Sequence, residues 1–169
     1  MTPRAVSSQR TQTLQIIWTA ITGSTVVYWL LGIFLMQPFP KPYASPTVTA
    51  LMLVLSASTL ATAWALYRHH IGSIEAQLTP TMLQRLGPAE RVILAGRVQL
   101  GAIICLALLE TPALYGLASG LAHVTSISLL TLLASASFLA CLAFRMLAFP
   151  NIRRLIDMLD PATSSSPPA

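Results

Sequence analysis

Apolar residues along this chain are gathered into four long runs that short polar segments separate. The runs cover residues 14–36, 47–67, 92–120 and 124–149. Each holds about 20 residues or more, the length that an α-helix needs to cross a hydrocarbon core of about 30 Å. The pattern therefore predicts an all-α fold of four transmembrane helices, packed as two hairpins.

Composition narrows the class of protein further. Hydrophobic residues make up 54% of the chain and charged residues only 9%, with a mean hydropathy of +0.69. Soluble domains carry about 25% charged residues, so this chain lacks the polar side chains that would cover a water-exposed surface. No segment outside the four runs is long enough for a separate soluble domain. We therefore expect one membrane domain over residues 1–160, followed by a disordered tail, rich in serine and proline, at 161–169.

Positive charge is distributed unequally between the two sides of the membrane that this topology defines. Of the 10 basic residues, Lys41 alone falls on one side. The remainder lie on the other side: Arg4, Arg10, Arg68, Arg85, Arg91, Arg97, Arg145, Arg153 and Arg154. Because short basic loops stay in the cytoplasm, the sequence predicts that both termini and the 68–91 connection are cytoplasmic, in a bacterial inner membrane. Anionic lipid accounts for the net charge of +5, and no nucleic-acid partner is expected.

Two short segments have the pattern of helices at the membrane surface. After Pro150, apolar residues recur at helical spacing opposite a charged face: Ile152, Leu155, Ile156 and Leu159 against Arg153, Arg154, Asp157 and Asp160. This pattern predicts a helix over residues 151–160 that lies on the cytoplasmic leaflet and buries its apolar stripe there. In the 68–91 connection, Thr79 followed by Pro80 predicts the N-cap and first position of another short helix.

Glu110 is the acidic residue that falls inside a predicted span. Counting about 1.5 Å per residue from Arg97 places it roughly 19 Å into the membrane, near the midplane. An acidic residue at that depth costs about 2.5 to 3.5 kcal/mol, so we expect a neutral, hydrogen-bonded group that faces the bundle or water. The candidate hydrogen-bonding partners are hydroxyl groups on three of the predicted spans: Thr111 and Tyr115; Ser128, Thr131 and Ser135; and Ser56 and Thr59.

Residues near Glu110 also predict how the helices pack. Pro112 cannot donate a hydrogen bond to the carbonyl of Leu108, which leaves an unfilled acceptor and predicts a kink. Gly116 and Gly120 form a GxxxG pair. A second pair of small residues, Ala136 and Ala140, lies on the fourth span. Such pairs allow close helix contact, which we expect within the chain rather than between chains.

Few residues in the sequence suggest reaction chemistry. It contains no glycine-rich phosphate loop, nucleophile elbow or zinc motif, so we expect neither an enzyme nor a cofactor. His69 and His70 are expected to be solvated, and Cys105 and Cys141 to be packing residues. No metal site is predicted.

The intramembrane carboxyl group leads to two hypotheses for function. In the favoured one, Glu110 fixes helix packing in a non-enzymatic accessory or scaffold subunit. In the alternative, Glu110 is the ion site of a proton- or cation-linked carrier, with Thr111, Tyr115 and hydroxyl groups of the fourth span as ligands. The expected partners are the lipid bilayer and, as open alternatives, other membrane subunits or a second copy of the chain.

The run from Glu110 to Leu117, with the sequence ETPALYGL, resembles the carboxylate-bearing helix of F- and V-type ATPase proteolipids. The resemblance implies that Glu110 matches the ion-binding carboxylate and Tyr115 its neighbour. Over more of its length the chain is similar to small four-helix bacterial membrane proteins of uncharacterised function. That wider resemblance implies a fold and no activity.

Overall fold

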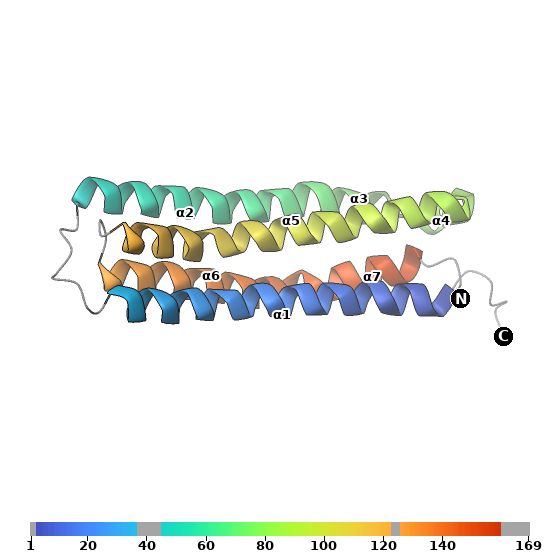
Figure 1. The fold of residues 1–169 in the computed structure, drawn as a ribbon. Coiled ribbons are helices and arrows are strands. Elements are labelled where there is room, and N and C mark those ends of the chain that lie inside the picture. Colours follow the sequence, from blue (N-terminus) through green and yellow to red (C-terminus); the bar gives the residue numbers. More distant parts are fainter. Residues whose placement is uncertain (1–2, 37–44, 123–125, 160–169) are drawn as a thin grey trace.

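The computed structural model describes residues 3–36, 45–122 and 126–159, and every regular element within these ranges is a helix. Four helices are long: α1 (Pro3–Met36), α2 (Pro46–Leu66), α5 (Pro88–Leu121) and α6 (Ile127–Leu147) (Figure 1). Four stretches are long and apolar enough to cross a membrane: Gln9–Met36, Pro46–Gln77, Pro88–Leu121 and Ile127–Leu147. The predicted all-α fold with four candidate membrane spans is confirmed. The predicted tail at 161–169 lies outside the described residues.

Short helices make up the connection between α2 and α5. α2 continues into the π-helical segment η1 (Tyr67–Ile71) and then into α3 (Gly72–Gln77), after which α4 (Pro80–Arg85) follows. The predicted cap of α4 is present, because the Thr79 hydroxyl accepts a hydrogen bond from the Met82 amide at 3.3 Å. Pro80 lies in the first turn, as the sequence predicted.

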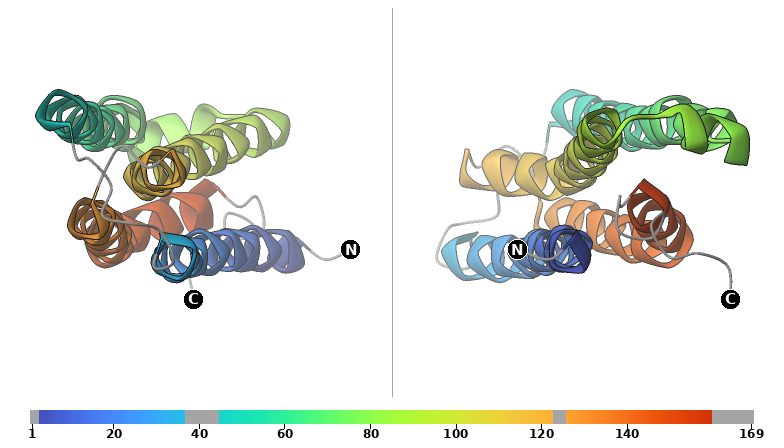
Figure 2. Two further views of the ribbon diagram at one scale, coloured as in Figure 1. Left: turned by 60° about the vertical axis from the view of Figure 1, so that its left-hand side comes forward. Right: turned by 90° about the vertical axis from the view of Figure 1, so that its right-hand side faces the viewer.

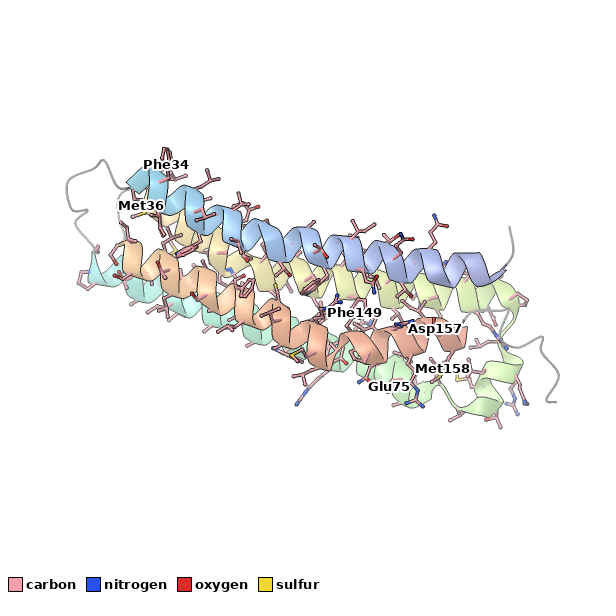
Figure 3. The ribbon with its side chains drawn as sticks, turned by 90° about the horizontal axis from the view of Figure 1, so that it is seen from below. Phe34, Met36, Glu75, Phe149, Asp157 and Met158 are labelled. Carbon is pink, nitrogen blue, oxygen red and sulfur yellow. The ribbon has the colours of Figure 1, made fainter. Side chains whose placement is uncertain are left out.

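One end of the bundle carries most of the described charge. Figure 1 places α3, α4 and α7 (Phe149–Leu159) at the same end as the start of α1. Figure 3 shows Glu75, Phe149, Asp157 and Met158 there, with Phe34 and Met36 at the opposite end. The arginines whose side chains are described belong to helix segments at or near the first end: Arg10, Arg68, Arg85, Arg91, Arg97, Arg145, Arg153 and Arg154. Lys41 lies outside the described residues.

The long helix α5 is the centre of the bundle. α6, α1 and α2 each have their most extensive contacts with α5, and α1 and α2 lie on opposite sides of it (Figure 2). The expected hairpin packing is therefore not seen for the first two spans. Small buried residues on several faces of α5 explain the difference, because they let three helices approach one: Ala95, Gly101, Ala102, Cys105, Ala113, Gly116, Ser119 and Gly120.

The two glycines of the GxxxG pair contact different helices of the same chain. A β-carbon at Gly116 would lie 3.2 Å from Leu130 Cδ1 and 3.3 Å from Leu130 Cα, on α6. At Gly120 it would lie 2.6 Å from the sulfur of Met36, at the end of α1. Within the described residues both glycines thus serve packing inside the chain. Ala136 and Ala140 are half-buried on α6.

The amphipathic helix predicted after α6 forms, but its apolar stripe is covered by protein. Ile152, Leu155, Ile156 and Leu159 are at most 2% exposed. They join the core cluster that includes Val98, and α7 contacts α5 more extensively than it contacts any other helix. α5 has 34 residues and α6 has 21, so α5 extends beyond α6 and offers α7 a surface to pack on. The expectation that this stripe is buried in the leaflet is therefore corrected.

Candidate functional site

Glu110 receives its hydrogen bond from a helix that the sequence did not indicate. The hydroxyl of Ser24, on α1, donates to Glu110 Oε1. The same hydroxyl oxygen lies 2.7 Å from the carbonyl oxygen of Ile21, one turn earlier on α1. The Ser24 hydroxyl therefore links α1 to the carboxyl group of α5.

Polar groups on α1 and α6 lie close to this pair, and within the described residues Glu110 forms no ion pair. Thr25 donates to the carbonyl of Thr22 at 2.8 Å. Cys141 of α6 lies beside the Thr22 hydroxyl and within electrostatic range of Glu110. Within the described residues, the ion pair closer than 4.0 Å joins Arg153 and Asp157 at the surface of α7. Among the described side chains, the polar partner of Glu110 is therefore the Ser24 hydroxyl.

The carboxyl group lies at the edge of the contact between α1 and α5. Glu110 is half-buried. Around the α5 helix, Leu106 and Ala113 on one side of Glu110 are buried, whereas Ala107 and Leu114 on the other side are exposed. Because residues three and four positions apart are neighbours on a helix, Glu110 marks the boundary between the packed face and the open face of α5.

The structure does not bring the predicted partners to Glu110. Thr111 donates to the carbonyl of Ala107 on its own helix at 3.0 Å. Thr131 accepts a hydrogen bond from the indole nitrogen of Trp29 at 3.1 Å. Tyr115 is half-buried, and Ser128 and Ser135 are exposed. On α2, Thr59 donates to the carbonyl of Ser56 at 2.9 Å.

A groove between α1 and α6 lies beside the face of α6 that holds Ser135. The groove has a volume of about 380 Å³ and is lined mainly by apolar side chains. Ser135 lies in it together with Thr25, Trp29 and Phe138. The face that holds Ser128 and Ser135 is therefore turned toward the outside of the bundle and away from Glu110.

A depth count would have identified Ser24. α1 and α5 run in the same direction through the bundle (Figure 1). Ser24 follows Arg10 by 14 residues, and Glu110 follows Arg97 by 13 residues. Since Arg10 and Arg97 both belong to the charged end, similar counts give similar depths. The sequence therefore contained a signal for a hydroxyl group of the first span.

A second hydroxyl that the sequence did not indicate bonds to a backbone carbonyl near Pro112. Ser137, fully buried on α6, donates to the carbonyl oxygen of Leu109. Pro112 lacks an amide hydrogen for the carbonyl of Leu108, the next residue back along the chain. Side-chain hydroxyls often satisfy backbone groups near a proline in membrane helices. Ser137 is thus a packing group of the α5 and α6 contact.

The described part of the chain offers few ligands for a metal ion or a cofactor. No group of three or more His, Cys, Asp or Glu side chains there could hold a metal ion. The two cysteines are buried at different helix contacts, and Cys105 Sγ donates to the carbonyl of Ala63 on α2 at 3.5 Å.

Among protein-family models, curated proteins and solved structures, nothing matches this chain.

Proposed function

We propose that this chain is a small integral membrane protein without catalytic activity that acts as an accessory or scaffold subunit. In this proposal Glu110 is a structural group that ties α5 to α1. The hydrogen bond between Ser24 and Glu110 carries the proposal, because it joins α1 to α5 across their contact. The lack of a cation near Glu110 in the described structure supports the same interpretation.

The proposal includes an orientation and a location. Both termini are cytoplasmic. The helices α3, α4 and α7 lie at the cytoplasmic face of a bacterial inner membrane. The concentration of arginines at this end of the bundle supports the orientation. The partners are lipid and either another membrane subunit or a second copy of this chain. These partners would contact the outer faces of α1 and α2, because the helix contacts inside the chain leave those faces uncovered.

The alternative function is a proton- or cation-linked carrier that uses Glu110 reversibly. One observation favours it: the carboxyl group is half-buried at an open edge of the α1 and α5 contact, where an ion or proton donor could reach it. Intramembrane acids often mark such ion paths.

Carbodiimide labelling of Glu110 in native membranes separates the two functions. The reagent modifies neutral carboxyl groups, and intact mass detects the product across pH and with or without sodium. A structural Glu110 is held by Ser24, so labelling of the unmodified chain should be the same at every pH and with or without sodium, and it should increase in Ser24→Ala. Glu110→Gln identifies labelling at other acids.

Labelling of the unmodified chain that fades with rising pH, or that sodium prevents, would contradict the structural role. It would show that Glu110 exchanges protons or binds cations, as a carrier requires.

A further inference from the structure

A cleft lies at the charged end of the bundle, between the short helices and the first turns of α5. Its volume is about 260 Å³. One wall is a single face of α5, where Glu90, Ile93, Leu94 and Arg97 follow one another at helical spacing. The opposite wall comes from α3, α4 and the residues beside them: Ile74, Gln77, Leu78, Met82 and Leu86. The cleft is therefore apolar except for Gln77 and the two charged residues of α5.

The walls of this cleft are fastened together by Arg91. Its side chain is 8% exposed, and its guanidinium group donates to the carbonyl of Leu86 at 3.2 Å and to the carbonyl of Leu83. These two carbonyls belong to the end of α4, so Arg91 holds α4 on α5. Glu90 Oε2 also accepts a hydrogen bond from the amide of Gly87, at 3.0 Å. The cleft is thus preformed, and a ligand would not have to order it.

The position of the cleft along α5 matches the headgroup level of a membrane. Arg97 is the last charged residue before the uncharged stretch that leads to Glu110. Side chains on a helix lean toward its N-terminus, which directs Arg97 from the hydrocarbon toward Glu90 and the water. In the described structure Glu90 and Arg97 form no ion pair with each other, and both side chains are exposed. The cleft therefore presents a cation nearer the hydrocarbon and an anion nearer the water.

We propose that this cleft binds the headgroup of a phospholipid that has a phosphate and a primary ammonium group, as phosphatidylethanolamine has. Arg97 would pair with the phosphate in a charge-assisted bond, and Glu90 would accept a hydrogen bond from the ammonium group. The apolar side chains of Ile93, Leu78 and Met82 would cover the glycerol and the first acyl carbons. The order of the charges fits this lipid, in which the phosphate lies between the acyl chains and the ammonium group.

The same chemistry discriminates against the other common phospholipids. A purely anionic headgroup, such as phosphatidylglycerol, would place no cation at Glu90 and would be repelled by it. A choline headgroup carries a quaternary ammonium, which has no N–H to donate to Glu90. The preferred lipid should therefore be the ethanolamine lipid, and this preference does not depend on what Glu110 does.

Native mass spectrometry of the full chain tests the proposal with dioleoyl lipids of the three headgroups, added in turn and in competition. The unmodified chain should retain phosphatidylethanolamine about tenfold better than phosphatidylcholine or phosphatidylglycerol, the factor expected for one charge-assisted bond. This measurement requires no variant. Arg97→Gln should lose the bound lipid. Glu90→Gln should keep its fold and its lipid, because the amide oxygen still caps Gly87. It should lose the preference over phosphatidylcholine, because the carboxylate that attracts the ammonium group is gone.

Arg85→Gln is the matched control, because Arg85 is exposed on α4 and does not line the cleft. It should behave as the unmodified chain does. Equal retention of the three lipids by the unmodified chain would overturn the proposal. So would a preference for phosphatidylglycerol, which would indicate nonspecific attraction to the arginines, or unchanged lipid retention in a folded Arg97→Gln variant.

Discussion

The two halves of α5 hold the bundle together by opposite means. At the charged end, Arg91 is buried and donates to two backbone carbonyls of the α4 end. In the membrane half, the glycines and alanines of α5 make close contacts, and Glu110 has a hydrogen bond from Ser24. A guanidinium group cannot lose its charge in a protein, whereas a carboxyl group can become neutral. This difference fits the placement of the base at the charged end of α5 and of the acid in its apolar half.

The charged end also uses long side chains where the membrane half uses small ones. Arg10 of α1 donates to the carbonyl of Val92 at 3.3 Å. Arg145 of α6 lies 4.3 Å above the ring of Trp18, whose indole nitrogen donates to the carbonyl of Cys141 at 3.1 Å. Near water such side chains can bury their apolar part and keep the charge hydrated. In the hydrocarbon they cannot, so close packing takes their place.

The largest effect should follow from enlarging Gly116. Gly116→Leu places a side chain where even a β-carbon would lie 3.2 Å from Leu130 Cδ1 and 3.3 Å from Leu130 Cα. Because the backbone of α6 cannot move away freely, we expect a loss of about 1 to 3 kcal/mol in the free energy of unfolding, measured in detergent micelles. Gly23→Leu is the control, since a β-carbon at Gly23 has nothing within 4 Å. Equal effects at the two glycines would contradict the close contact of α5 and α6.

The next effect should be local and confined to the charged end. Arg91→Gln removes the donor from two partly buried carbonyls that water can reach, which costs about 0.5 to 1 kcal/mol for each hydrogen bond lost. We expect α4 to detach, so hydrogen exchange should speed up for residues 79–87 while α6 keeps its protection. Arg85→Gln, on the exposed face of α4, should leave exchange unchanged. Faster exchange throughout the bundle in Arg91→Gln would show that the two halves of α5 are not independent.

Much of this fold was predictable because the length of each apolar run determines where a membrane-spanning helix can form. The apolar runs gave four spans, the spacing of Thr79 and Pro80 gave a capped helix, and the stripe from Ile152 to Leu159 gave another. Each of these signals is local in the sequence. What covers a helix is not local: the α7 stripe packs on α5 because α5 extends beyond α6, which no run of apolar residues reveals.

The partner of Glu110 was missed for a related reason. The predicted partners were hydroxyl groups on the second and fourth spans and on the helix of Glu110 itself, which assumes that sequence neighbours are spatial neighbours. α1 lies beside α5 instead, and α2 lies on the other side. Similar depth along parallel helices, counted from Arg10 and Arg97, would have given Ser24. Which faces of α5 are occupied by which helices depends on small residues on several sides of it, and one sequence leaves that order open.

The smallest effect should come from the Ser24 and Glu110 pair. A double-mutant cycle of Ser24→Ala and Glu110→Ala should give a favourable coupling of about 0.6 kcal/mol, the average for hydrogen bonds between membrane helices, in the free energy of unfolding. Glu110→Gln should be as stable as the unmodified chain, because its amide can donate to Ser24 while Ser24 donates to Ile21. Thr111→Val is the control, since Thr111 bonds to its own helix and should show no coupling to Ser24.

Two results of this cycle would revise the comparison between the halves of α5. The absence of coupling would mean that the contact of Ser24 with Glu110 stabilises nothing. A Glu110→Ala variant more stable than the unmodified chain would mean that the carboxyl group is kept at a cost, as an ion site is. In the charged half, Arg91→Gln should be destabilising whatever the protein does. In the membrane half, the sign of the Glu110→Ala effect distinguishes a packing group from a carrier site.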